Sequence, residues 1–246
     1  AAESRHVHRD AQRALEAALV DLAAAKSSAR TTARLHDALA GAAFGLGEYE
    51  HAVAQLRVAL DLDHDDVARR MRRNVRLGEA LERWGRYDEA DVAYEGALRD
   101  LPLVADLATA SRIYGGLATV RARLGELDDA LELGRLAVDF AGDRPSRICD
   151  AHLKLCVIHW RRDELDDAVA HGNAARHALA GVGAGSGSGD TGRLAAVSNN
   201  LGLVHATRGE STAAIEHFRA AVEAFTECGN EHGLACALDN LAQALT

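Results

Sequence analysis

The sequence predicts an all-α protein that is built from repeated pairs of helices. Its 246 residues are 48% hydrophobic but only 4% aromatic, with two prolines, and this alanine- and leucine-rich composition favours packed helices over β-sheet. Apolar and small residues recur at helical spacing from Met71 to Pro102, with a break at Gly85. Because the same pattern of apolar, small and turn residues recurs along the chain, we expect one solenoid of stacked helix pairs.

The stretch between Met71 and Pro102 defines the repeating pair. Its spacing places one amphipathic helix before Gly85 and a second after it, joined by a tight turn. We expect the second helix to end at Pro102, since proline has no backbone N–H with which to continue a helix. The residues that carry the pattern are Leu77, Gly78, Leu81, Tyr87, Ala90, Tyr94, Ala97 and Leu98.

These residues lie at the offsets of a tetratricopeptide repeat, and the stretch resembles that family at almost every signature position. The exception is Asn74, which stands where the family has an early tryptophan. The resemblance implies a right-handed superhelix, an α-solenoid whose concave groove binds a protein or peptide segment. The signature leucine of the repeat recurs as Leu39, Leu77, Leu117, Leu155, Leu201 and Leu241.

Residues at two other offsets support the repeat. The residue after each signature leucine is small, so the paired helices should approach closely. A glycine recurs in the turn of the pairs, and Asp163 takes its place once, since aspartate tolerates a left-handed backbone better than most residues. The turn glycines are Gly47, Gly85, Gly125 and Gly209.

The whole chain, residues 1–246, is expected to form one solenoid domain with a leading helix at 4–25 and a capping helix at 231–246. The segment 181–192, GVGAGSGSGDTG, is predicted by its composition to be a flexible Gly/Ser linker. About five helix pairs are expected, at residues 32–62, 71–102, 103–141, 145–180 and 193–226.

The repeats are longer than the usual length of about 34 residues. Successive signature leucines are 38, 40, 38, 46 and 40 residues apart. This long-repeat variant resembles the repeat regions of bacterial signalling and transcriptional regulators, and also the light chain of kinesin motors. The phrase TECGNEHGLA at residues 226–235 is typical of the first group. That resemblance implies the sensor or interaction region of a cytoplasmic bacterial regulator. The chain begins with Ala-Ala-Glu-Ser instead of methionine, which predicts a piece of a longer or processed protein.

Charge, hydropathy and cysteine content oppose several classes of function. The formal net charge of −9 does not favour nucleic acid or anionic lipid as a partner of the whole chain. The sequence contains no run of 18 apolar residues, so we expect no membrane span. It also does not begin with a charged-then-apolar leader. The four cysteines form no C-x-x-C pair, so we interpret them as reduced, buried thiols of a cytoplasmic protein.

The sequence contains no recognisable catalytic motif. It lacks the phosphate-binding G-x-x-x-x-G-K-[ST], the zinc motif H-E-x-x-H and the nucleophile motif G-x-S-x-G. We therefore expect no catalytic residue, no cofactor and no enzymatic activity.

The strongest candidate for a metal site is a run of cysteines and histidines on one face of one helix. The first and last of them are about 15 Å apart along the helix axis, and a tetrahedral site needs ligands from more than one direction. They also occupy packing positions of the repeat, so we predict no metal site. The run comprises Cys149, His152, Cys156 and His159.

A ladder of arginines is the main candidate for partner binding. By resemblance, the first helix of each pair lines the groove, and Arg34, Arg72 and Arg112 stand five residues before the signature leucine in three successive pairs. Arginine binds carboxylate and phosphate through parallel hydrogen bonds, so an acidic segment would suit these side chains. Alternatively, the arginines pair with acidic residues of the array itself, such as Glu79 or Asp37.

Further candidates for partner contact lie on the first helices of other pairs. Trp160 is either an aromatic anchor in the groove or a packing residue at a helix end. Asparagine can hold the backbone of an extended peptide, because it offers both a donor and an acceptor. A full carboxylate clamp is not expected, because Ala196 and Cys236 stand where basic residues would be needed. The candidates are Arg76, Lys154, Trp160, Asn199, Asn200 and Asn240.

The sequence thus predicts a non-catalytic scaffold that binds a protein or peptide segment. A first alternative is a small-molecule-binding domain or an enzyme that uses the solenoid as a cup. A second alternative is nucleic-acid binding through the arginines, which the net charge of −9 opposes.

Overall fold

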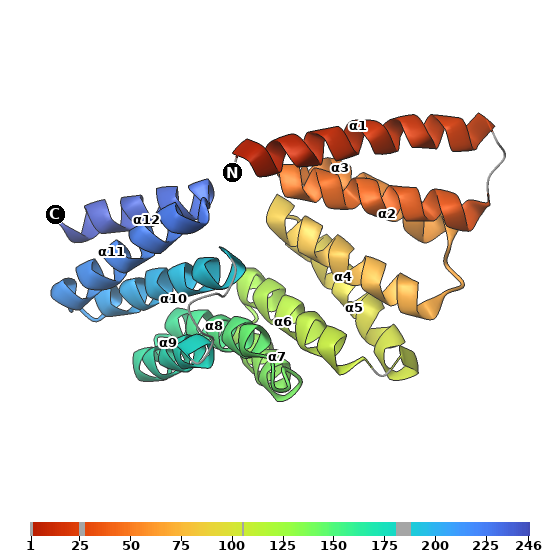
Figure 1. Cartoon of the computed structure of the whole chain (residues 1–246). Coiled ribbons are helices and arrows are strands. Elements are labelled where there is room, and N and C mark those ends of the chain that lie inside the picture. Colours follow the sequence, from red (N-terminus) through yellow and green to blue (C-terminus); the bar gives the residue numbers. More distant parts are fainter. Residues whose placement is uncertain (1, 25–27, 105, 181–187) are drawn as a thin grey trace. The chain divides into compact units, whose positions relative to one another are not determined.

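The computed structural model describes residues 2–24, 28–104, 106–180 and 188–246. Within these ranges every regular element is an α-helix, which confirms the predicted fold class (Figure 1). None of the helices described is both long enough and apolar enough to cross a membrane. In chain order the helices are α1 (Ala2–Ala24), α2 (Ala29–Leu46), α3 (Tyr49–Leu62), α4 (Val67–Trp84), α5 (Tyr87–Val104), α6 (Leu107–Leu124), α7 (Leu127–Asp139), α8 (Pro145–Arg161), α9 (Leu165–Ala180), α10 (Ser188–Thr207), α11 (Ser211–Cys228) and α12 (Glu231–Ala244).

The helices form two compact units, which divide after Leu124. In the N-terminal unit, α1 packs on α2, the pairs α2/α3 and α4/α5 lie next to each other, and α6 packs on α4 and α5. In the C-terminal unit, the pairs α8/α9 and α10/α11 lie next to each other, with α7 on α8 and α12 on α10 and α11. Each unit is therefore a stack of helix pairs.

Aromatic side chains of second helices pack on glycines of first helices. Tyr94 of α5 is 1% exposed, and a Cβ atom at Gly78 of α4 would lie only 2.8 Å from its ring. A Cβ atom at Gly116 of α6 would also overlap this ring. Phe218 of α11 packs in the same way on Gly202 of α10, where a Cβ atom would lie 2.6 Å from the ring. The small residue after the signature leucine thus permits the close approach that the sequence predicts.

The turns within the pairs have the predicted left-handed conformation. Gly85 has φ of 80°, and its N–H donates to the carbonyls of Leu81 and Glu82 at the end of α4. Asp163, which replaces the turn glycine, has φ of 61° and is the one non-glycine residue with positive φ in the described part of the chain. Aspartate tolerates this conformation, so the prediction for this turn is confirmed.

Two predicted boundaries are wrong. Helix α5 does not end at Pro102 but continues to Val104, with the proline inside its last turn. The predicted linker 181–192 includes residues 181–187, which lie outside the described residues, but Ser188–Gly192 are the first turns of α10. Asp190 and Arg193 form an ion pair one turn apart there, which stabilises this end of the helix.

Ion pairs connect neighbouring helices within each unit. In the N-terminal unit, Arg121 of α6 contacts Asp91 of α5 at 2.8 Å. In the C-terminal unit, Arg193 of α10 donates through two nitrogens to both carboxylate oxygens of Asp150 on α8, at 2.9 and 3.1 Å. Two parallel bonds of this kind fix the position of one helix pair on the next.

Candidate partner-binding surface

The three arginines of the ladder lie on the first helices of the N-terminal unit. Arg34 is on α2, Arg72 on α4 and Arg112 on α6, and all three side chains are exposed. Helices α4 and α6 are in contact, so the equivalent positions of neighbouring pairs share one face of this unit. This face is called the arginine face below.

One arginine of the ladder is already paired. The guanidinium of Arg112 donates from Nη2 and Nε to Glu79 of α4, at 2.7 and 3.2 Å. For this residue the alternative of pairing within the array is the one that the structure adopts. The pair is largely exposed, so it contributes little to stability.

The other two arginines have no ion pair within the described residues. Arg34 makes no hydrogen bond there, and Arg72 donates only to the backbone carbonyl of Ala68, at 3.1 Å. The pKa of Asp106 is lowered, mainly by a hydrogen bond from the Thr109 hydroxyl and to a smaller degree by the charge of Arg72. Arg34 and Arg72 therefore present cationic groups that an added carboxylate can reach.

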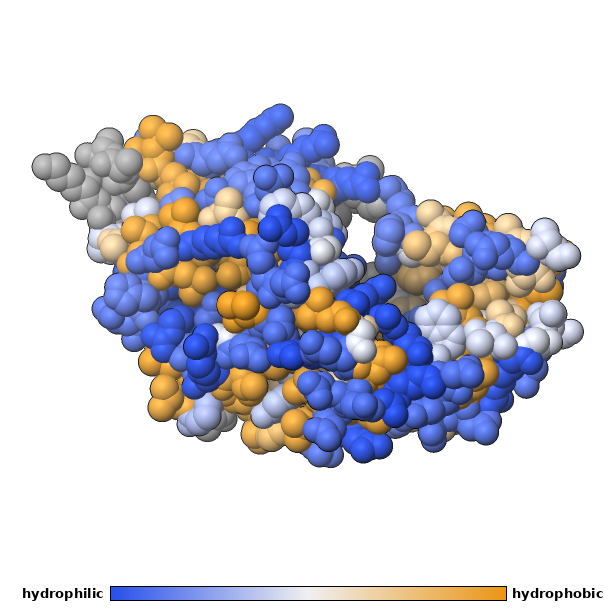
Figure 2. Space-filling model, turned by 180° about the vertical axis from the view of Figure 1, so that it is seen from behind, coloured by the Kyte–Doolittle hydropathy of each residue, from blue (hydrophilic) through white to orange (hydrophobic). Residues whose placement is uncertain are grey.

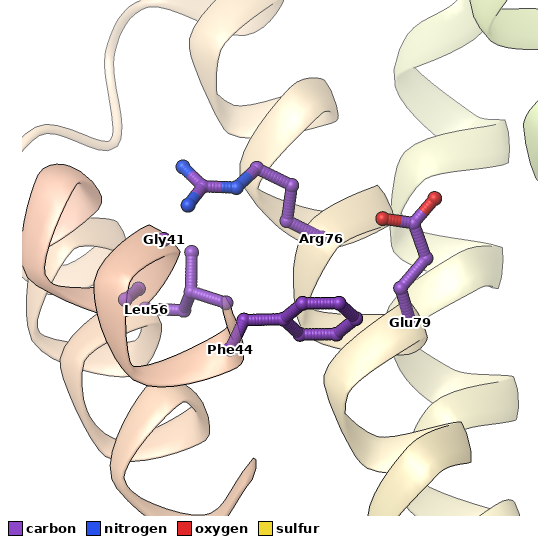
Figure 3. Close-up of a pocket in the computed structure, with 6 residues that line it drawn as sticks. Gly41, Phe44, Leu56, Arg76 and Glu79 are labelled. Atoms are coloured by element: carbon purple, nitrogen blue, oxygen red, sulfur yellow. The ribbon is translucent and has the colours of Figure 1, made fainter. Parts of the chain in front are cut away.

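A small hollow opens between α2 and α4, the helices that carry Arg34 and Arg72. Figure 3 shows Arg76 reaching from α4 toward α2, while the ring of Phe44 extends from α2 toward α4. Arg76 donates from Nη2 to the backbone carbonyl of Asp37 at 2.9 Å, which holds its side chain over Gly41. The lining residues are Ala40, Gly41, Phe44, Leu56, Arg76 and Glu79.

The size of the α2–α4 hollow limits what it can hold. Its volume is about 130 Å³, well below the roughly 300–1,000 Å³ of sites for drug-sized ligands. A protein cavity of about 150 Å³ accommodates benzene. The α2–α4 hollow therefore has room for a single side chain, whose apolar part would contact Ala40, Phe44 and Leu56 between the charged groups of Arg76 and Glu79.

A second hollow, which the sequence did not predict, lies at the turn between α2 and α3. Its volume is about 520 Å³, and Tyr49, Trp84 and two glutamates contribute to its lining. Trp84 is partly exposed, and the guanidinium of Arg86 lies 5.2 Å from the centre of its ring. A tryptophan directly before a turn glycine, Trp84-Gly85, was the available signal in the sequence. The lining residues are Gly47, Glu48, Tyr49, Glu50, His51, Ala54 and Trp84.

On the face seen from behind, the exposed apolar residues of the described part of the chain do not single out another binding face. Figure 2 shows hydrophobic residues in separate patches among hydrophilic ones on the face seen from behind. Val92, Leu103 and Leu107 are the most exposed large apolar residues of α5 and α6, at 68%, 72% and 64%. Single exposed apolar residues are normal on soluble proteins.

The remaining candidates belong to the C-terminal unit and form a separate set. Trp160 packs with Cys156 and Val204, and its Nε1 donates to the Thr207 hydroxyl at 2.8 Å, which favours the packing role. Lys154 on α8 is partly buried. The two asparagines Asn199 and Asn240 are bonded to each other at 3.0 Å, and Asn200 beside them is partly exposed.

A histidine cluster of the C-terminal unit was missed by sequence reasoning. His171 of α9 stacks between His152 and His159 of α8, with ring centres 5.2 and 5.1 Å apart. Burial, and then the two neighbouring histidines, lower the pKa of His171 to about 4. Burial also lowers the pKa of His152. The run His-x4-Glu-x6-His at 159–171, which recurs at 205–217, was the signal in the sequence.

The buried cysteines are unsuited to nucleophilic chemistry. Burial raises the pKa of Cys149 and of Cys156 to about 12. The reactive form of cysteine is the thiolate, so both side chains stay protonated and inert near neutral pH. All four cysteines are free thiols.

Comparison with known proteins supports the repeat. The tetratricopeptide repeat family matches residues 72–99, within the pair α4/α5. No curated protein matches the sequence.

Solved structures with a similar fold have low sequence identity to this chain. BtubC (BKLC) from P. vanneervenii has a TM-score of 0.67 at 18% identity, covering 92% of this chain and 91% of its own. A chain of the APC/C hetero-tetramer Cut9–Hcn1 has a TM-score of 0.66 at 17% identity, covering 98% of this chain and 48% of its own. MamA 41-end from Desulfovibrio magneticus RS-1 has a TM-score of 0.53 at 17% identity, covering 79% and 96%. At such identities the likeness shows the fold alone.

Proposed function

We propose that this tetratricopeptide repeat protein is a non-catalytic scaffold whose arginine face binds an acidic segment of a partner protein. The observation that carries the proposal is that two exposed arginines without an ion pair, Arg34 and Arg72, stand on the two helices between which the α2–α4 hollow opens. Cationic side chains that form no ion pair can accept an anionic group, and a hollow of this size can hold one side chain of a peptide.

The spacing along the helices defines the segment that would fit. Arg34 is seven residues before Gly41 on α2, so it lies on the same side of the helix, about 10 Å along the axis. Arg72 is four residues before Arg76 on α4, about 6 Å along the axis. An extended peptide advances about 3.3 Å per residue. The ligand is therefore an apolar residue with acidic residues about two and three positions away.

Binding of synthetic peptides tests this proposal. Short fluorescent peptides would carry one leucine and two glutamates at these spacings, in both sequence orders, with glutamine replacing glutamate in the reference peptides. We expect the acidic peptides to bind more tightly and to lose affinity as salt screens the contact. Arg72→Ala should weaken binding by about 1–3 kcal/mol, the range for a hydrogen bond to a charged group.

Arg99→Ala is the matched control, because Arg99 is an exposed arginine of the same unit but lies on the second helix α5. It should leave peptide affinity unchanged. Both substitutions should leave the melting temperature nearly unchanged, since exposed side chains add little stability. Equal affinity of the parent and Arg72→Ala proteins at low salt would remove the arginine face from the binding site.

The cellular setting belongs to the same proposal. We place the protein in the cytoplasm as the sensor or interaction region of a bacterial regulator. Its four free thiols suit a reducing compartment, and its long repeats resemble those of such regulators. Capture of partners with the parent and with Arg72→Ala in parallel would identify proteins that depend on the arginine face.

The hollow at the turn between α2 and α3 favours one alternative. Its volume of about 520 Å³ lies within the usual range for small-molecule sites, about 300–1,000 Å³. Its glutamates would select a cationic ligand, which would compete with Arg86 for the ring of Trp84. A thermal-shift screen with small organic cations tests this alternative. A shift that Trp84→Ala abolishes, with no effect of acidic peptides, would favour it over the scaffold.

A further inference from the structure

Three potential metal ligands meet where α8 turns into α9. His159 lies near the end of α8, Glu164 in the turn, and Asp167 in the first turn of α9. One potential ligand atom of each residue lies within 4.8 Å of the corresponding atoms of the other two. The Nδ1 atom of His159 is 2.7 Å from Oε2 of Glu164.

The turn removes the geometric objection to a metal site on this helix. Cysteines and histidines along one helix face cannot converge on one ion, but these three side chains approach from a helix end, a turn and a second helix. Ligand atoms about 2.1 Å from a tetrahedral ion lie roughly 3.4 Å apart. The three atoms now lie within 4.8 Å of one another, so the exposed Asp167 side chain would have to move closer to reach that separation.

The charges around the three residues leave a net negative site. Arg162 donates from Nε to Oε1 of Glu164 at 2.9 Å, so Oε2 is the oxygen that faces His159. The charge of Arg162 is also matched by Asp128, to which its Nη1 donates. Two carboxylates therefore remain to offset a dication.

The packing of the imidazole fixes its orientation. His159 is 5% exposed, and its ring stacks on His171 with an angle of 11° between the planes. A ligand held in this way loses little conformational entropy on binding a metal ion.

We propose that His159, Glu164 and Asp167 bind a divalent transition-metal ion of the Zn²⁺ class. One imidazole and two carboxylates are donors that Zn²⁺ accepts, and water completes the coordination. The site is independent of the arginine face, which belongs to the other unit.

The next helix pair contains an incomplete copy of the same arrangement. His205, Glu210 and His217 stand 46 residues after His159, Glu164 and His171, and the rings of His205 and His217 stack at the same 11°. Ala213 stands at the position of Asp167. The copy lacks its third ligand, so it supplies an internal comparison.

Titration of the full chain with zinc chloride, after treatment with a chelator, tests the proposal by calorimetry. We expect one tight ion per chain, and Asp167→Ala should weaken its binding by more than about tenfold. Asp129→Ala is the matched control, because Asp129 is an exposed carboxylate at the equivalent position of α7, where Arg121 and Leu133 stand in place of the histidines. It should bind zinc like the parent.

The reverse substitution gives a second, independent outcome. Ala213→Asp adds the missing carboxylate beside His205 and Glu210, and should raise the number of tight zinc ions from one to two per chain. Circular dichroism of each variant confirms that it is folded. Failure of the parent to bind zinc, or equal affinity of the parent and Asp167→Ala, would overturn the proposal.

Discussion

Arg73 of α4 and Asp37 of α2 are 36 residues apart in the chain, and the guanidinium Nε of Arg73 donates to both carboxylate oxygens of Asp37, at 3.1 and 3.0 Å. Arg73 is 2% exposed, and it also contacts Asp63 at 3.2 Å. The pKa of Arg73 is raised, because the hydrogen bonds and charges of the two aspartates outweigh the opposing effect of burial. The buried cation therefore connects the first two helix pairs.

Asp37→Ala should destabilise the N-terminal unit by about 2 kcal/mol, because it leaves a buried guanidinium with one carboxylate instead of two. Urea denaturation followed by tryptophan fluorescence measures this in a Trp160→Phe background, where Trp84 reports on the N-terminal unit. Asp61→Ala, on the exposed side of α3, should change stability little. Equal midpoints for the two variants would contradict the role of the pair.

Gly116→Ala should also destabilise the N-terminal unit, by about 1–3 kcal/mol, because the added methyl group overlaps the buried ring of Tyr94. Combining it with Tyr94→Leu, which removes the ring, should make the alanine substitution cost less than it does alone. The same denaturation assay measures both. Gly192→Ala on α10 is the control, since a Cβ atom there has only an ordinary contact of 3.7 Å with Cys228 and alanine favours a helix. A Gly116→Ala protein as stable as the parent would show that the ring can move aside.

The cysteines should differ in reactivity. Cys236 is exposed and Cys228 partly buried, whereas Cys149 and Cys156 are buried and have a raised pKa. With a thiol reagent at about pH 8, we expect Cys236 to react first, and Cys149 and Cys156 only as the C-terminal unit opens. Cys236→Ser should remove the fastest phase. Four thiols reacting at one rate in the native protein would contradict this order.

Acidification should destabilise the C-terminal unit through His217. Burial, and then the charges of His205 and Arg176, lower the pKa of His217, while Glu216 acts in the opposite direction. As the pH falls below about 6.5, the unfolded chain takes up the proton first. The stability that His217 contributes is therefore present above that pH and is lost as the pH falls toward the lower pKa of the folded state.

Urea midpoints measured across this pH range check the effect, in a Trp84→Phe background where Trp160 reports on the C-terminal unit. The loss of stability on acidification should be smaller in His217→Gln than in the parent. His232→Gln, at an exposed position of α12, should keep the full loss. The same pH profile for the parent and His217→Gln would contradict the prediction.

The sequence predicted the features of the fold that depend on local pattern. Gly85 and Asp163 have the left-handed turns expected of them, since backbone freedom at one position decides such a turn. The end of α5 was misplaced at Pro102 because the residue type predicts a helix end only statistically, and here the proline lies inside the last turn. Ser188–Gly192 were predicted to be part of a linker but are helical, because composition does not reveal the ion pair between Asp190 and Arg193.

The sites were predicted less well, because they depend on distances between helices. The ladder offset identified Arg34, Arg72 and Arg112 as equivalent, and all three are exposed. The ion pair between Arg112 and Glu79 depends on the distance between α4 and α6, which the sequence period does not define. The stacking of His171 was not predicted for a similar reason, since its partners lie on a different helix.

The contacts of Arg73 make the first two repeats unequal. If the second repeat were copied in tandem, the arginine of the new copy would need acids in the copy before it. At the offsets of Asp37 and Asp63, the second repeat has Val75 and Leu101. The duplicated arginine would be buried among aliphatic side chains with no counter-charge, a state that costs several kcal/mol. A tandem copy of the second repeat would therefore be destabilised from the start, unless its arginine were replaced by an apolar residue.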